Sequence, residues 1–308
     1  MPHSKTAARV ALVSVLSNTT LTILKFTAAL LSGSVSILSE GLHSSMDLVA
    51  SIIALIAVRV SRKPPDQGHP WGHGKAENVS GVAEGLLIFV AAFLIVGEAV
   101  KKIVEPHPVD APALGILVMA FSAVVNSVVS FVLYRTAKKT RSLALEADAL
   151  HLKTDVYTSA GVAVGLVLMT LTNLPILDPL VAILVALLIF KEAWHLVAKS
   201  FGPLLDVGLD TAERQTIERV IGEFMTGGAG YHGLKARRAG HQIFVEFHLT
   251  MPGATPLETA HALTERIEVA LGQALEGTEA VIHMEPDAEV PPGDQGTETR
   301  FLPPSLAR

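Results

Sequence analysis

The chain has 308 residues, of which 50% are hydrophobic and 17% are charged. Soluble domains carry about 25% charged residues, so this composition indicates a membrane protein. The net charge of −5 is mild and gives no sign of a nucleic-acid partner. Because the sequence contains no cysteine, disulfides and thiolate ligands are excluded, and any metal must be held by His, Asp or Glu.

Six segments are long and apolar enough to cross a bilayer, which requires roughly 20 apolar residues. They lie at residues 9–31, 36–60, 78–103, 111–134, 143–172 and 176–199. We interpret the first as a transmembrane helix, not a cleaved signal peptide, because it lacks an apolar core followed by an A-x-A site. We therefore expect a membrane α-helical domain of six transmembrane helices over residues 1–205.

Basic residues gather around two of the connecting loops. Arg59, Arg62, Lys63 and Lys75 flank the loop after the second span, and Arg135, Lys138, Lys139 and Arg141 flank the loop after the fourth. The positive-inside rule then places these loops and both termini in the cytoplasm. We expect a multi-pass protein of the cell (inner) membrane.

The hydropathy falls after residue 205, and the apolar periodicity changes. An amphipathic helix is expected at 210–225, a weak strand at 231–238, an alternating strand at 241–250, a helix at 255–275 and a last strand at 279–285. This α-β-β-α-β order predicts a small cytoplasmic α+β domain of the ferredoxin/metallochaperone type over residues 206–290. The tail, residues 291–308, is rich in Pro and Gly, which is typical of a disordered segment.

Two of the spans carry the same pair of ionisable residues. His43 and Asp47 in the second span, and His151 and Asp155 in the fifth, are four residues apart and therefore share a helix face. An ionisable side chain at membrane depth costs several kcal/mol and usually serves a function. One pair alone could simply line a polar groove. Two such pairs favour a tetrahedral site for a divalent ion.

Two further groups of possible ligands lie outside the spans. Asp66, His69 and His73 fall within eight residues of a Pro- and Gly-rich loop, which could fold around an ion or merely be solvated. The last domain carries His232, His241, His248, His261 and His283 together with Glu285. These could be ordinary surface histidines, but their number favours metal binding, and His283 and Glu285 share a strand face.

Four motifs in chain order resemble those of the cation diffusion facilitator family of divalent-metal/proton antiporters: SEGLHSSMD, HPWGHGKAE, ADALHLKTD and VIHMEPD. The resemblance covers about residues 10–287. It implies a transport site of His43, Asp47, His151 and Asp155, and a loop site of Asp66, His69 and His73. It also implies a binuclear cytoplasmic site of His232, His248, His261 and His283, with Glu285, that helps to hold a homodimer together.

The sequence departs from some family members at two ligand positions. Where some members have Asp, this chain has His43, and the His form resembles the zinc-preferring members. Glu285 stands where Asp is found elsewhere, and its extra methylene leaves the geometry of the second cytoplasmic ion open.

The resemblance implies an antiporter that exports Zn²⁺ from the cytoplasm in exchange for protons by alternating access. Zn²⁺ would be both the transported ion and a structural or regulatory one. Two imidazoles among four ligands favour the zinc end of the divalent series, although export of Mn²⁺, Fe²⁺, Co²⁺ or Cd²⁺ stays open.

Two other classes of protein fit the sequence less well than a transporter. A membrane metalloprotease would need an H-E-x-x-H helix, and neither His43 nor His151 is followed by Glu, so we expect no enzyme. A metal sensor without transport is a further alternative, but four ligands inside the spans favour transport.

Overall fold

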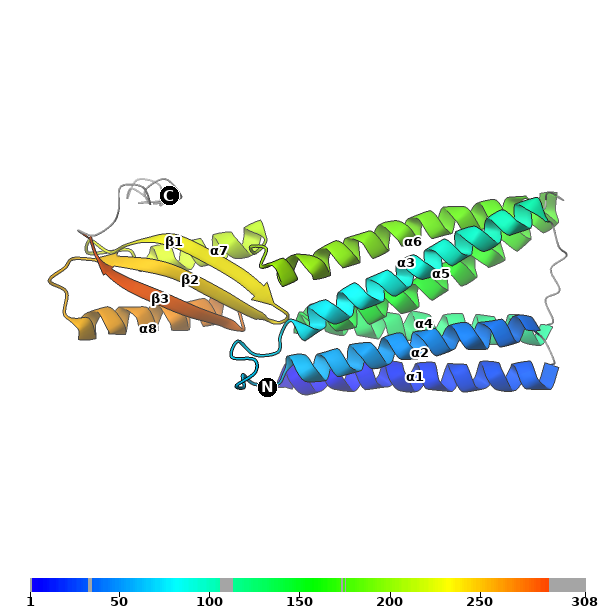
Figure 1. Ribbon diagram of the computed structural model, residues 1–308, viewed down its shortest axis with the longest axis horizontal. Helices are drawn as coiled ribbons and strands as arrows, with labels where there is room; N and C mark the ends of the chain where they lie inside the picture. Colours follow the sequence, from blue (N-terminus) through cyan, green and yellow to red (C-terminus); the bar gives the residue numbers. More distant parts are fainter. Residues whose placement is uncertain (1, 33–34, 106–112, 173, 175, 288–308) are drawn as a thin grey trace. The chain divides into compact units, whose positions relative to one another are not determined.

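The computed structural model describes residues 2–32, 35–105, 113–172, 174 and 176–287 (Figure 1). The side chains of some helical residues, His43 among them, lie outside this description, as does the expected tail at 291–308. The chain divides into two compact units, Met1–Leu204 and Leu205–Arg308, and each is described by itself.

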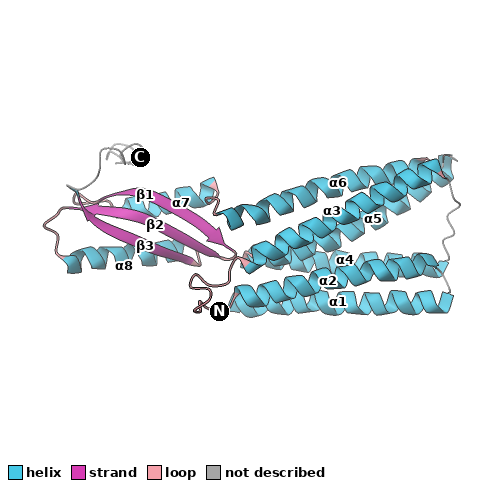
Figure 2. Ribbon diagram, in the orientation of Figure 1, coloured by secondary structure: helices cyan, strands magenta, loops and turns pink. Residues whose placement is uncertain are grey.

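The first unit consists of long helices that lie side by side (Figures 1 and 2). They are α1 (Pro2–Ser32), α2 (Val35–Ser61), α3 (Ala76–Val104), α4 (Ala113–Thr140), α5 (Leu143–Thr172) and α6 (Leu177–Phe201), followed by a 3₁₀ turn, η1 (Gly202–Leu205). Within the described residues, α1, α2, α3, α4 and α6 are long and apolar enough to cross a membrane. The predicted helical membrane domain is confirmed.

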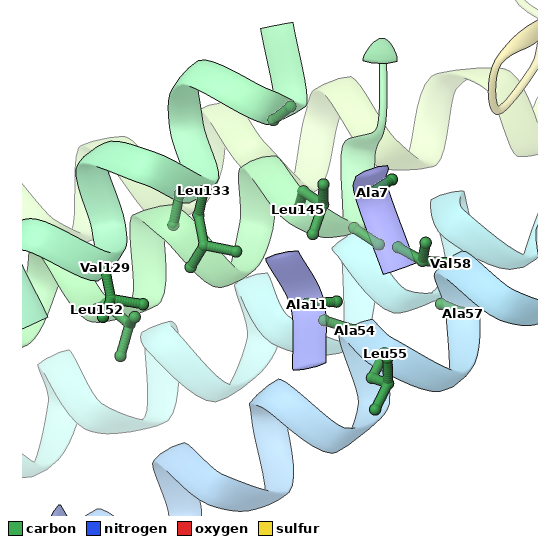
Figure 3. Close-up of a cluster of buried hydrophobic side chains, with 13 residues drawn as sticks. Ala7, Ala11, Ala54, Leu55, Ala57, Val58, Val129, Leu133, Leu145 and Leu152 are labelled. Carbon is green, nitrogen blue, oxygen red and sulfur yellow. The ribbon is translucent and has the colours of Figure 1, made fainter. Parts of the chain in front are cut away.

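Helix α5 links two apolar cores. It packs against α2, α3, α4 and α6. One core joins α1, α2, α4 and α5 and includes Leu133, Leu145 and Leu152 (Figure 3), whereas the other joins α3, α5 and α6 through Ile88 and Ile189. Small residues on α5 let its neighbours approach closely, which is how helices associate when lipid removes the hydrophobic driving force.

Helix α4 is longer than the sequence predicts. The apolar run that predicts the fourth span stops at residue 134, but the helix continues to Thr140. The additional turns carry Arg135, Lys138 and Lys139, whose charges can be solvated beyond the hydrocarbon while the backbone remains hydrogen-bonded within the helix. Hydropathy marks the edge of the lipid and not the end of the helix.

The second unit is an α-β-β-α-β domain, as predicted. Its elements are α7 (Thr211–Glu223), β1 (Gly230–Ala239), β2 (Gln242–Met251), α8 (Leu257–Ala274) and β3 (Thr278–Pro286). The sheet order is β1-β2-β3, with β1 antiparallel and β3 parallel to the central strand. The core of the domain gathers Ile217 and Ile221 from α7, Phe247 and Leu249 from β2, and Ile267 and Leu271 from α8.

Local sequence explains how this domain begins. The Asp210 side chain caps α7 by accepting a 2.8 Å hydrogen bond from the Glu213 backbone N–H. Along β2, buried Ile243, Val245 and Phe247 alternate with residues on the other face. The opposite face of β2 carries polar residues such as Glu246 and His248 together with the buried Phe244.

Two glycines of α3 make its contact with α6 possible. A Cβ at Gly85 would lie 2.5 Å from Val197 Cγ2, and a Cβ at Gly81 would collide with the Ser200 side chain. Val197 is β-branched and has little rotamer freedom on a helix, so it cannot move aside easily. Close packing of α3 on α6 requires the absence of a side chain at these positions.

We predict that Gly85→Leu destabilises the membrane unit by about 1–3 kcal/mol, because the new side chain overpacks the α3–α6 contact. The matched control is Gly97→Leu on the same helix, where nothing lies within 4 Å of the added Cβ. The melting temperature of each variant in detergent measures the effect. Equal shifts in the two variants would contradict the assigned contact.

Candidate metal sites

Helices α2 and α5 bring three possible ligands together inside the membrane unit. His151 Nε2 lies 3.1 Å from Asp47 Oδ1, and one ligand atom each from Asp47, His151 and Asp155 lies within 4.8 Å of the others. Asp47 and His151 are buried, with 4% and 7% of their surfaces exposed. Asp155 is half-buried. This intramembrane cluster brings together three of the four residues of the two His-x3-Asp pairs.

The donor set of the intramembrane cluster suits a small divalent ion. Tetrahedral Zn²⁺ has bonds of roughly 2.0–2.2 Å, which separates its ligand atoms by about 3.3 Å. The 3.1 Å between His151 Nε2 and Asp47 Oδ1 is close to this separation. Two carboxylates offset the charge of a divalent cation, so each reduces the desolvation penalty of the other.

His43 lies on α2, one turn before Asp47. Its side chain is outside the described residues, so its position as the fourth ligand remains a prediction.

The loop between α2 and α3 folds around Asp66. The backbone N–H groups of Gly68 and His69 donate to Asp66 Oδ1 at 2.9 and 2.7 Å. The two imidazoles lie around the same carboxylate, with His69 Nδ1 3.4 Å from Oδ1 and His73 Nε2 3.3 Å from Oδ2. The backbone hydrogen bond from His69 lowers the pKa of Asp66, so the carboxylate is ionised at neutral pH and available to a cation.

In the second unit, three histidines form one row across the sheet. His232 on β1 pairs with His248 on β2, and His248 pairs with His283 on β3. Neighbouring imidazole rings have centroids 4.8 and 5.0 Å apart. Gly233, next to His232, has φ of 64°, a left-handed conformation that favours glycine.

Glu285 reaches all three imidazoles of the histidine row. Its carboxylate oxygens lie 3.0 Å from His232 Nε2, 2.6 Å from His248 Nδ1 and 3.5 Å from His283 Nε2. Partial burial tends to raise the pKa of Glu285, but hydrogen bonds from His248 and His232 outweigh this effect and lower it. Although Glu285 is one methylene longer than the Asp of some family members, its carboxylate still lies among the three histidines.

Two histidines of this domain stand apart from the row. His261, on α8, lies 3.5 Å from Glu265 one turn later and is not in the group formed by His232, His248 and Glu285. Its role as a ligand remains a prediction. His241 lies at the turn between β1 and β2.

The structure also reveals buried polar residues that the sequence analysis missed. On α1, Asn18 Nδ2 donates to the Asp47 backbone carbonyl at 3.3 Å, and Lys25 Nζ donates to Ser44 Oγ at 2.7 Å. On α3, Glu84 is fully buried and accepts a 2.8 Å hydrogen bond from Ser80. The signals were polar positions three to four residues apart in the first span and an acid, Glu84, amid the apolar residues of the third.

Comparison with known proteins agrees with this architecture. Residues 11–205 match the family model of the cation efflux transmembrane domain, and residues 209–287 match that of the cation efflux protein cytoplasmic domain. An uncharacterized transporter of Synechocystis sp. is 38% identical over 263 residues, which cover 85% of each chain.

Two further relatives cover very different shares of this chain. The cation-efflux pump FieF of Cronobacter sakazakii is 33% identical over 295 residues, covering 96% of this chain and 97% of FieF. A solved structure of CzrB in its Zn form is 45% identical and covers 27% of this chain and 96% of its own, with a TM-score of 0.26.

The matches over both units define the class: the protein is a multi-pass membrane transporter for cation efflux and not an enzyme. The chain belongs to the cation diffusion facilitator family, which confirms the resemblance drawn from its four motifs.

We predict that Zn²⁺ raises the melting temperature of the second unit, because a ligand that binds only the folded state stabilises it by about 2.7 kcal/mol at 100 times its Kd. His232→Ala should lose most of this shift, since it removes a buried ligand. His241→Ala, a histidine outside the row, is the control and should keep the shift. A zinc shift that survives His232→Ala would rule out the row as the binding site.

Proposed function

We propose that this transporter exports Zn²⁺ from the cytoplasm in exchange for protons, by alternating access. The carrying observation is the buried cluster of Asp47, His151 and Asp155 between α2 and α5. Two carboxylates and imidazole ligands match zinc chemistry, and burial between packed helices allows the ion to be shielded from both sides of the membrane.

The orientation follows from the basic residues at one end of the membrane unit. Arg59 lies in the last turn of α2, and Lys138 and Lys139 lie in the last turn of α4. The positive-inside rule supports a cytoplasmic position for these ends, for both termini and for the second unit, in the cell (inner) membrane. Zinc would then enter from the side that carries the loop cluster around Asp66.

The two apolar cores support a mechanism for alternating access. The core of α1, α2 and α4 and the core of α3 and α6 share only one helix among the described residues, α5, which carries His151 and Asp155. Relative movement of the two cores about α5 would open the intramembrane cluster first to one side and then to the other.

Proton exchange follows from the charge of the empty site. Without metal, Asp47 and Asp155 leave two negative charges in a low-dielectric interior, where uncompensated charges are strongly unfavourable. Imidazole titrates at about pH 6.5 and must be neutral to bind metal, so His43 and His151 are suited to carry protons on the return step.

The histidine row is proposed as a resident zinc site that supports a homodimer. The ligand atoms of His232, His248 and Glu285 are close enough to share an ion, and these residues come from all three strands. Bound there, Zn²⁺ would cross-link the sheet. The matched cytoplasmic domain family is named for dimers, which supports a dimeric assembly.

Replacing Asp47 with Asn should abolish zinc transport while the protein remains folded. Loss of one buried charge partner costs about 3–5 kcal/mol, which corresponds to at least roughly a hundredfold loss of affinity. Glu98→Gln, an exposed acid on α3, is the control. Zinc uptake into inside-out vesicles, with and without a pH gradient, measures the effect, and Mn²⁺, Fe²⁺ and Co²⁺ are run in parallel. Wild-type flux in Asp47→Asn would refute the site.

His43→Asp should make the site more anionic and admit cadmium alongside zinc, because carboxylate is a less directional and less selective ligand than imidazole. It should also shift the pH profile of transport, since an imidazole is replaced by a carboxylate, whose reference pKa is about 2.5 units lower. A competition flux assay of zinc against cadmium at several pH values tests this role. If both the metal ratio and the pH profile stay unchanged, His43 does not select the ion.

A further inference from the structure

A cavity of about 620 Å³ opens between α4, α5 and α6. Its described walls contain none of the candidate metal ligands. Polar lining residues include Lys138 and Tyr134 on α4, Lys153 on α5 and Lys199 on α6. The volume lies within the range of about 300–1,000 Å³ typical of small-molecule sites.

The charges of this cavity favour an anion. Three lysines and two glutamates line it, which leaves one net positive charge when His195 is neutral. Glu146 is already engaged, because both of its carboxylate oxygens accept hydrogen bonds from Lys199 Nζ, at 2.8 and 2.7 Å. Lys138 and Lys153 lie over tyrosine rings, 5.3 and 5.2 Å from the ring centroids. A metal cation would meet net repulsion here.

Basic and apolar residues of the cavity lie at overlapping depths. Lys138 and Lys199 each lie two residues from the end of their helix, and Lys153 lies ten residues into α5, a depth of roughly 15 Å. Phe131, Leu150, Val156 and Leu196 complete the apolar wall. The Phe131 and Tyr134 side chains are 62% and 49% exposed, so this wall faces the surroundings of the bundle. The arrangement matches an amphiphile with an anionic head.

We propose that this cavity binds an anionic phospholipid, with its phosphate at Lys138 near the end of α4, an acyl chain along Phe131 and Leu196, and Lys153 adding positive charge deeper in the cavity. Basic pockets between transmembrane helices at a membrane surface are suited to such headgroups. An inorganic phosphate shares the head chemistry but cannot use the apolar wall. Because the lipid would contact α4, α5 and α6 together, it would stabilise the junction between the two apolar cores.

The test uses the purified full chain in a neutral detergent. Phosphatidylglycerol, phosphatidylcholine with the same acyl chains and inorganic phosphate are titrated separately, and the melting temperature and the binding curve are recorded. We expect phosphatidylglycerol to raise the melting temperature more than the other two. Lys138→Gln combined with Lys153→Gln should weaken phosphatidylglycerol binding by about fivefold per lysine.

Two further variants keep the result interpretable. Lys138→Gln alone, near the end of α4, should still lower affinity if the double variant fails to fold. Lys139→Gln, on the same helix turn but not among the lining residues, should bind as the wild type does. Equal effects of the two lipids, equal losses in the Lys138 and Lys139 variants, or a rise in melting temperature with inorganic phosphate as large as that with phosphatidylglycerol would each overturn the proposal.

Discussion

Two carboxylates held inside a membrane protein set the central constraint on this fold. Asp47 and Asp155 lie in one small cluster with His151, where a low dielectric makes unbalanced charge highly unfavourable. Every stable state must therefore bring positive charge to them. In the proposed exchange, a divalent metal would do so in one state and protons in another, so coupling between the two would arise from the cost of leaving the cluster anionic.

Helix α5 meets this constraint by having small residues on its packed faces. Ala144, Ala147 and Ala149 are buried, and they allow other helices to lie close to a helix that also carries two possible ligands. Polar groups from other helices support the same region, since Asn18 binds the backbone of Asp47 and Glu84 is buried on α3. The ligands are thus positioned by close helix packing and not by a flexible loop.

How far each site can be predicted depends on whether its geometry is local. The His-x3-Asp spacing determines which residues share a helix face, so His151 and Asp155 could be paired from the sequence alone. Joining them to Asp47 on another helix rests on the repeated pattern and on the family resemblance. The histidine row depends on strand register, which the alternation of β2 does not specify. A register shift in β1 between His232 and Lys235 makes the pairing of His232 with His248 still harder to predict from the sequence. Contacts such as Lys25 with Ser44 require knowing which helices are neighbours.

The parallel pairing of β2 with β3 sets an order of events during synthesis. His232 and His248 become neighbours through a short hairpin, whereas His283 and Glu285 join them only after α8 has crossed back over the sheet. The complete set of donors therefore exists only once Glu285 has left the ribosome, after all the membrane helices have been made. A chain that stops before Glu285 lacks one of the donors around the row, so the metal binding proposed there would depend on β3 having been made.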